Sequence, residues 1–428
     1  MDHFELKNGE LYCEDVPLAE IAASVGTPVY VYSTATMCRH VAALRDALEP
    51  LGDPLIAYAV KANSNSAVIA TLARAGLGAD VVSGGEYARA RFAGVPPERI
   101  VFSGVGKTAG EMRLALEGGF FQFNLESLEE AEMLSAIAAG MGRTAPVGFR
   151  VNPDVGAGGH AKITTGAASN KFGIAIGEAL DAYRRIAGLP GLHVQGVAVH
   201  IGSQLTSLDP LERAFLRIGE LMAGLRSAGH EISVADLGGG LGVPYDPDQQ
   251  APPSPADYAA MVRRVAGAWN ARLVFEPGRL IVGNAGVLLS RVIRVKPGAI
   301  DPFVIVDAAM NDLMRPALYD AWHLIEAVRP TGRRRIANVV GPVCETGDTF
   351  ATAREMDEIG EGELLVFRTA GAYAAAMSGT YNSRPLTPEV LVDGDRWSVV
   401  RPRIGVEGLI AMDRIPDWLG GCAPLSSS

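Results

Sequence analysis

Residues 55–76 read "LIAYAVKANSNSAVIATLARAG": an apolar run, a polar turn, and a stretch rich in alanine and leucine. The run 55–62 has the length and composition of a buried strand, and 65–76 is typical of an amphipathic helix. The same order of strand, turn and helix recurs along the chain. A fold built from β-α units is therefore expected.

Eight such apolar runs can be counted. They are "LIAYAVKA" (55–62), "GADVVS" (78–83), "RIVFSG" (99–104), "FQFNLE" (121–126), "PVGFRVN" (146–152), "VQGVAVHIGS" (194–203), "ISVADLGGG" (232–240) and "RLVFEPG" (272–278). Between them lie helical stretches such as 127–140, which opens with the capping-box pattern Ser127-x-x-Glu130. Strands of this kind need burial on both faces and helices to connect them, so eight units in series predict a parallel (β/α)₈ barrel.

The texture of the sequence changes beyond residue 280. Alternating, β-branched runs such as "PFVIVDAAM" and "RRIANVVGPVC" are separated by Pro, Gly and Asp, which predicts a second, mostly antiparallel β-domain. We expect the barrel to span residues 29–278. The second domain, sandwich-like or barrel-like, is expected to combine residues 1–28 with 279–428.

The connection after the fifth strand, 153–173, is too long for a plain connector. A surface insertion is one interpretation. A lid or binding loop is favoured, because His160, Lys162 and Lys171 offer groups that bind anions.

The bulk composition excludes several classes of function. The 428 residues are 48% apolar and 20% charged, with a net charge of −10, so no basic face is available for nucleic acid or an anionic membrane. No apolar run approaches the ~18–20 residues of a membrane span, and the N-terminus lacks the apolar core of a targeting segment. A cytoplasmic protein is the expectation.

The four cysteines are Cys13, Cys38, Cys344 and Cys422. They are widely scattered and have no C-x-x-C pair or neighbouring histidines at zinc spacing, so neither a disulfide framework nor a metal site is expected. Cys344 could still be an inert core thiol or a catalytic group.

In a (β/α)₈ barrel the active site lies at the carboxyl ends of the strands. Those ends carry a ring of polar residues: Lys61, Asp80, Ser103, Asn124 with Glu126, Arg150, His200 with Ser203, Gly238-Gly239-Gly240, and Glu276 with Arg279. An isolated Lys61 would simply reach solvent, and an isolated His200 would be a satisfied core histidine. Within this ring, we expect desolvation and neighbouring cations to lower the pKa of Lys61 enough to make it a nucleophile.

The glycine cluster follows the seventh strand, where barrels of this type often hold a phosphate. A lysine, a phosphate cradle and an acid on the last strand together suggest pyridoxal 5′-phosphate (PLP). This cofactor needs a lysine, an anion site and a partner for its pyridine nitrogen, and Glu276 suits the last role.

Seven motifs over nearly the whole chain resemble the diaminopimelate decarboxylase family of PLP enzymes, which has the alanine-racemase-like fold. In chain order they are "YAVKAN", "HIGSQ", "DLGGGLG", "EPGR", "MNDLMRPALYDAWH", "GPVCETGDTF" and "GAYAAAMSGTYNSRP". The resemblance implies removal of the α-carboxylate at the D-configured centre of meso-2,6-diaminopimelate, giving L-lysine and carbon dioxide in the last step of lysine biosynthesis.

The resemblance also implies roles for residues that bind the cofactor. Lys61 looks like the lysine that binds PLP covalently, His200 like the residue that stacks on its ring, and Glu276 like the partner of the pyridine nitrogen. The phosphate is expected to lie against Gly238, Gly239 and Gly240, with Ser203 and Arg279 nearby and Tyr373 closing on it from the second domain. Gly278 is a further expected cofactor-binding residue, and Asp80 and Arg150 look like supports around the cofactor site. Leu280 departs from the small polar residue that is usual after "EPGR", and local repacking is expected there.

For the substrate, Arg279, Arg315, Tyr319 and Tyr373 resemble the groups around its carboxylates, Glu345 the group that holds its distal ammonium, and Cys344 the acid that protonates the α-carbon. The family places the Cys-Glu segment in the barrel mouth of a neighbouring subunit, so a homodimer is implied.

Alternatives are a decarboxylase of the same fold acting on ornithine, arginine, lysine or carboxynorspermidine, an alanine racemase, and a non-catalytic PLP-binding paralogue. Ornithine-type members have aspartate where this chain has Glu345, and racemases need a tyrosine where it has Cys344. PLP carriers of this fold lack the second domain. A dead paralogue would be expected to have lost Lys61 or Cys344, and both are present.

Overall fold

A computed structural model describes residues 2–156 and 171–419. Eight parallel strands close into a barrel, because β9 pairs with both β8 and β11. The barrel strands are β5 (Leu55–Ala59), β6 (Gly78–Val81), β7 (Ile100–Phe102), β8 (Gln122–Leu125), β9 (Ala145–Asn152), β11 (Leu192–Ala198), β12 (Val234–Asp236) and β13 (Arg272–Phe275). All eight predicted strands are present in the predicted order, so the predicted barrel is confirmed.

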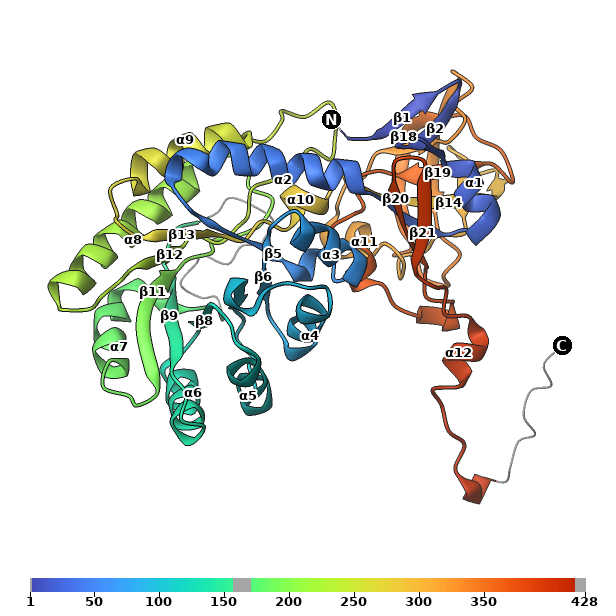
Figure 1. Ribbon diagram of the computed structural model, residues 1–428. Helices are drawn as coiled ribbons and strands as arrows, with labels where there is room; N and C mark the ends of the chain where they lie inside the picture. The colour runs from blue at the N-terminus through green and yellow to red at the C-terminus, as the bar shows by residue number, and fades with distance from the viewer. Residues whose placement is uncertain (1, 157–170, 420–428) are drawn as a thin grey trace.

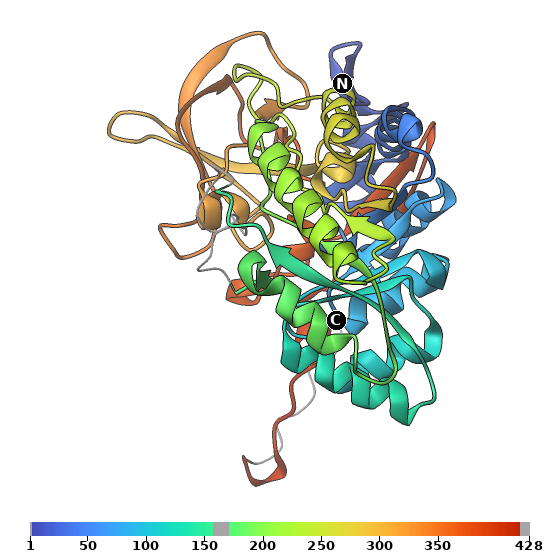
Figure 2. The ribbon, with the colours of Figure 1, turned by 90° about the vertical axis from the view of Figure 1, so that its left-hand side faces the viewer.

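Helices cover the outer face of the barrel (Figures 1 and 2). They are α2 (Thr34–Leu48), α3 (Ser66–Arg74), α4 (Gly84–Phe92), α5 (Ala109–Gly118), α6 (Leu128–Gly140), α7 (Ala179–Ile186), α8 (Asp209–Ser227) and α9 (Pro255–Ala266). At the start of α6 the Ser127 side chain accepts a hydrogen bond from the Glu130 amide, as predicted. The Glu130 carboxylate instead contacts Lys107 and the Glu126 amide, so only half of the capping box forms.

The helix after the last barrel strand is short, α10 (Arg279–Val282), and α2 packs beside it against α9. The eighth unit therefore lacks a long helix of its own, and α2, which precedes the first barrel strand β5 in the sequence, covers that position. The chain then runs from α10 directly into the second domain, which brings Arg279 to the seam between the domains.

The second domain contains a mostly antiparallel sheet in the order β18-β17-β15-β14-β4-β20-β21. Off this path, β19 pairs with β14, and β16 pairs with β19. Its strands are β4 (Val29–Ser33), β14 (Gly286–Lys296), β15 (Phe303–Val306), β16 (Ile325–Ala327), β17 (Arg334–Val340), β18 (Thr349–Asp357), β19 (Leu364–Phe367), β20 (Glu389–Asp393) and β21 (Arg396–Arg401). The boundary expected at residue 29 needs correction, since β4 pairs with β14 and β20 in this sheet. An apolar, fully buried "VYVYS" suits either sheet, so the sequence did not distinguish them.

The N-terminal segment packs on this second sheet. It contains β1 (Phe4–Lys7), β2 (Glu10–Cys13), β3 (Val16–Pro17) and α1 (Leu18–Val25). Phe4, Leu11 and Ile21 share an apolar cluster with Val287 and Val390 of the sheet. Burial of each large apolar side chain stabilises the folded state by roughly 1.5–3 kcal/mol.

Of the loop expected at 153–173, His160 and Lys162 lie outside the described residues, as does Cys422. The loop rejoins the described chain at Lys171 and continues into β10 (Ile174–Ala175), which pairs with β9. In the described ranges, no helix is long and apolar enough to cross a membrane, and no group of three His, Cys, Asp or Glu side chains could hold a metal ion.

Candidate active site

Lys61 lies in a short turn, η2 (Val60–Ala62), directly after β5, and its Nζ is 2.5 Å from Oδ2 of Asp80. Asp80 is the neighbouring strand end on β6 and is completely buried. Burial alone would lower the pKa of Lys61, but the charges of Asp80 and Glu276 outweigh it and raise that pKa. The expected lowering by neighbouring cations is therefore wrong, because the group facing the amine is a carboxylate.

Two further carboxyl groups lie at the same end of the barrel. Glu276 follows β13 and accepts a hydrogen bond from the Ser103 hydroxyl at 3.4 Å. Asp236 ends β12 and accepts from Asn124 Nδ2 at 2.7 Å and from the Gly238 amide at 2.9 Å. Burial raises the pKa of Asp236 to about 6, and burial together with the charges of Asp236 and Asp80 raises the pKa of Glu276 well above its usual range.

The glycines 238–240 form a tight loop after β12. A Cβ would lie 2.5 Å from the Val199 carbonyl oxygen at Gly238, 2.2 Å from that of Glu276 at Gly239, and 2.4 Å from that of Gly202 at Gly240. Gly238 and Gly240 also have positive φ, +65° and +114°. The loop can therefore run this close to its neighbours only without side chains, which leaves its backbone open to an anion.

His200 lies beside this loop, and its Nδ1 accepts a hydrogen bond from the Gly239 amide at 3.3 Å. Burial, reinforced by Arg150 and Lys61, lowers the pKa of His200 well below its usual range, so the ring is neutral. Arg150 donates to the His200 carbonyl oxygen at 3.3 Å and stacks over the Phe172 ring at 4.6 Å. These contacts hold a flat, uncharged ring at the barrel mouth.

Tyr373 comes from the second domain and reaches this mouth through backbone contacts. Its amide donates to the Ala62 carbonyl oxygen at 2.7 Å, and Asn63 Nδ2 donates to the Gly371 carbonyl oxygen at 3.2 Å. Tyr373 has a positive φ of +52°, which is energetically costly for any residue other than glycine. Residues in such conformations are often found at functional sites. A Cβ on Gly278 would lie 3.4 Å from the Tyr373 hydroxyl, an ordinary contact distance, so Tyr373 lies directly beside this glycine.

A cavity of about 550 Å³ opens beside Lys61, and its lining includes Arg279, Arg315, Tyr319 and Tyr373. Arg279 donates to Ser203 Oγ at 3.2 Å and to the Tyr245 hydroxyl, while its Nε is buried without a partner among the described residues. The cavity therefore presents buried cations, which would attract carboxylates or phosphate.

Arg315 begins α11 (Arg315–Tyr319) and is held from two sides. Its Nη1 is 3.0 Å from His323 Nε2, and its guanidinium lies 4.5 Å from the centre of the Tyr245 ring. His323 Nδ1 contacts the Arg368 carbonyl oxygen at 2.8 Å, so Nδ1 carries the proton and Nε2 accepts from Arg315.

Cys344 and Glu345 are not brought to this site within one chain. Both are exposed at the tip of the loop between β17 and β18, where the Cys344 amide donates to Asn382 Oδ1 at 3.2 Å. Neither lines any of the described cavities that contain Lys61. The other predicted site residues converge around Lys61. Leu280, where local repacking was expected, lies beside the same mouth and is partly buried against the barrel core.

Sequence reasoning missed Asp236, Tyr245 and His323. Asp236 was detectable, because it is the last residue of its strand and the rule of strand ends applies to it. His323 lies within "MNDLMRPALYDAWH", but its contact with Arg315 depends on tertiary packing. Tyr245 follows the glycine loop on an irregular segment, and no sequence signal marks it.

The comparisons with known proteins agree with this geometry. The family described as "Pyridoxal-dependent decarboxylase, pyridoxal binding domain" matches residues 35–283, a range that begins after β4 and ends before β14. Diaminopimelate decarboxylase of Zymomonas mobilis is 54% identical over 97% of this chain and 99% of its own length. The chain belongs to the diaminopimelate decarboxylase family.

Other members of the diaminopimelate decarboxylase family extend the likeness. The Pseudomonas aeruginosa enzyme is 50% identical over 96% of this chain and 98% of its own length. A crystal structure of diaminopimelate decarboxylase from M. jannaschii, in complex with L-lysine, has a TM-score of 0.94 and 35% identity, covering 98% of this chain and 99% of that one. Both domains are therefore shared, not only the barrel.

The residues at the barrel mouth fit the PLP used by this family. The mouth offers one amine at Lys61, a glycine cradle that admits no side chain, and a buried carboxyl group at Glu276. Two buried polar atoms, Asp80 Oδ1 and Arg279 Nε, lack partners within the described part of the chain. An amine, an anion cradle and an acid are the three groups that PLP requires.

Proposed function

We propose that this protein removes the α-carboxylate at the D centre of meso-2,6-diaminopimelate in a PLP-dependent reaction that yields L-lysine and carbon dioxide. The observation that carries the proposal is the convergence of Lys61, Glu276 and the glycine loop beside a cavity lined by Arg279 and Arg315. The names of relatives that are up to 54% identical support the choice of substrate.

When bound, PLP supplies an electron sink for the electron pair left at the α-carbon. We assign its covalent partner to Lys61, its ring contact to His200 and its pyridine-nitrogen partner to Glu276. Glu276 suits this role, because a carboxylate hydrogen-bonded to the ring nitrogen would keep the ring protonated. We assign its phosphate to Gly238, Gly239, Gly240, Ser203, Arg279 and Tyr373. Gly278 is a further cofactor contact, and Asp80 and Arg150 support the site.

Lys61 must lose a proton before it can act as a nucleophile. In the free protein its ammonium donates to Asp80 Oδ2, which keeps it charged. The two groups therefore form an ion pair that positions the amine and resists its deprotonation. Asp80 thus acts as a positioning residue for Lys61.

Substrate selection is assigned to the cavity next to Lys61. Arg279, Arg315, Tyr319 and Tyr373 would hold carboxylates of the substrate, and Glu345 its distal ammonium. An amino acid without the distal carboxylate would leave the buried Arg315 unpaired, and an unpaired buried charge is costly. The cost of the unpaired Arg315 favours diaminopimelate over ornithine, arginine and lysine.

Cys344 is assigned as the acid. The bond from the α-carbon to the carboxylate breaks, carbon dioxide leaves, the electron pair stays at the α-carbon, and the thiol gives that carbon its proton. The thiolate then regains a proton from solvent. Since Cys344 and Glu345 are exposed and line no described cavity that contains Lys61, we infer that they serve the barrel of a second copy, in a homodimer. A cytoplasmic location stays a prediction from the sequence.

The proposal is tested by measuring carbon dioxide release from meso-diaminopimelate, ornithine, arginine and lysine with the PLP-loaded protein. The expected preference in kcat/KM for meso-diaminopimelate is at least about 100-fold, because a missing partner for a buried charge is poorly tolerated. Comparable turnover of ornithine would overturn the substrate assignment. Lys61→Ala is the matched control: it should abolish both turnover and the visible absorption of bound PLP.

A further inference from the structure

The chain leaves the body of the protein after β21 and forms an extended segment, residues 404–419, which we call the C-terminal arm. It contains a short helix, α12 (Val406–Ile410), and a final turn, η8 (Asp417–Leu419). In both ribbon views it projects away from the two domains (Figures 1 and 2). Backbone hydrogen bonds between Ile404 and Leu386, at 3.0 and 3.3 Å, fix its root to the second domain.

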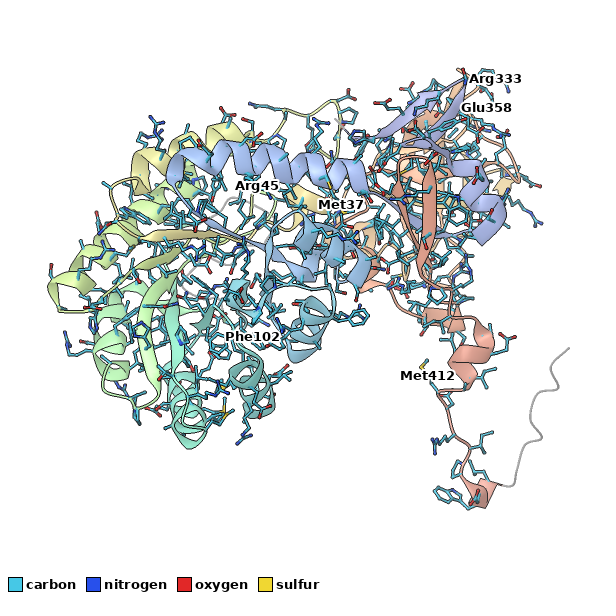
Figure 3. The ribbon with its side chains drawn as sticks, viewed as in Figure 1. Met37, Arg45, Phe102, Arg333, Glu358 and Met412 are labelled. Atoms are coloured by element: carbon cyan, nitrogen blue, oxygen red, sulfur yellow. The ribbon has the colours of Figure 1, made fainter. Side chains whose placement is uncertain are left out.

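The arm is apolar and uncovered. Of the eighteen large apolar side chains exposed in the described part of the chain, seven lie in the arm: Ile404, Val406, Ile410, Met412, Ile415, Trp418 and Leu419. Trp418 is 85% exposed and Met412 71%. Figure 3 shows the Met412 side chain standing clear of the body. Such a concentration of exposed apolar residues marks a binding surface, and Trp and Met are enriched in interfaces.

The root of the arm is continuous with the tip that carries Cys344 and Glu345. The Cys344 amide donates to Asn382, which lies in the turn η7 (Tyr381–Ser383). Four residues after Asn382, Leu386 pairs with Ile404 at the root of the arm. Tyr381, in the same turn, is half exposed. The Cys-Glu tip, this turn and the root of the arm are therefore linked by direct contacts and by the short stretch of chain from Asn382 to Leu386.

We propose that the C-terminal arm lies on a second copy of this chain and locks the dimer in which the catalytic site is shared. The inference rests on the proposed function: if Cys344 enters the barrel mouth of a second copy, the face next to it must meet that copy. The arm has the reach to extend further along that copy, since a chain with these two helical turns spans up to roughly 40 Å, at about 1.5 Å per residue in α12, about 2.0 Å in η8 and about 3.3 Å elsewhere. Its apolar side chains would then be removed from water on association.

The test compares the PLP-loaded wild type with the triple variant Met412→Ser, Ile415→Ser, Trp418→Ser by sedimentation velocity over a range of concentrations. The expected result is a dimer Kd at least about 30-fold higher in the variant, because interface aromatic residues are often hot spots. Circular dichroism and PLP absorbance should be unchanged. Ile300→Ser is the matched control, since Ile300 is 93% exposed on a turn of the body, and it should leave the Kd unchanged.

Equal dimer Kd values for the wild type and the triple variant would overturn the role of the arm, whether the arm folds back on its own chain or binds another protein. A wild type that is monomeric at all concentrations and still decarboxylates would overturn both the arm and the shared site. A dimeric wild type with separate, complete sites would contradict only the shared site, and the Kd comparison would still decide the role of the arm.

Discussion

The carbonyl oxygen of Glu276 occupies the space that a side chain at position 239 would need. A Cβ built on Gly239 falls 2.2 Å from this oxygen and 3.0 Å from its carbon. Ordinary contacts between carbon and a carbonyl oxygen begin at about 3.3 Å, so Gly239→Ala forces a shift of roughly 1 Å. The Glu276 amide donates to the Gly238 carbonyl oxygen at 2.8 Å, so the shift disturbs the loop and Glu276 together.

Overpacking of this size costs about 1–3 kcal/mol. If the cost falls on cofactor binding, the Kd for PLP should rise about 5- to 150-fold. The assay is a titration of the PLP-free protein with PLP, followed by the absorbance of the bound cofactor. A wild-type Kd in Gly239→Ala would refute the assignment of this loop to the phosphate.

Gly140→Ala is the matched control for this substitution. Gly140 ends α6, and a Cβ there would meet no atom within 4 Å. Alanine is favoured over glycine in a helix by roughly 0.5–1 kcal/mol, so this variant should be slightly more stable. Its Kd for PLP should equal that of the wild type, which separates the clash from a general effect of alanine.

Three further perturbations follow from the geometry. His323→Leu removes the acceptor of Arg315, so the KM for meso-diaminopimelate should rise about 10-fold with a smaller change in kcat; equal effects on both constants would contradict a positioning role. Burial raises the folded-state pKa of Asp236 from 3.8 to about 6, so this group lowers the stability of the PLP-free protein as pH rises between these two values. In urea unfolding, Asp236→Asn should lose less stability over this pH range than the wild type, and an equal loss would contradict the prediction. Lys107→Met leaves the buried carboxylate of Glu130 unpaired and should lower the free energy of unfolding by about 3–5 kcal/mol, whereas a loss below about 1 kcal/mol would show the pair to be dispensable.

The barrel could be predicted from the sequence because its strands are buried on both faces and each is followed by a polar end and a helix. Strands β5 and β6 are buried at every position, and Lys61 and Asp80 stand at their carboxyl ends. Position along a strand therefore determined which side chains meet, although they are separated in sequence.

What the sequence could not predict depends on distances between elements. The pKa of Lys61 is raised because Asp80 lies 2.5 Å away, and a strand count gives no such distance. The strand β4 joins the second sheet because β14 and β20 flank it, which its apolar residues do not reveal. Cys344 is far along the chain and exposed, so the role that we propose for this thiol depends on a second molecule.

The most direct test of the shared decarboxylase site mixes two inactive variants. Lys61→Ala lacks the amine, and Cys344→Ala keeps PLP but lacks the acid. If each site takes Lys61 from one copy and Cys344 from the other, random reassociation gives mixed dimers with one intact site. Release of carbon dioxide from meso-diaminopimelate should then recover to about a quarter of the wild-type rate, by the symmetry of the dimer. A mixture no more active than its separate components would contradict the account.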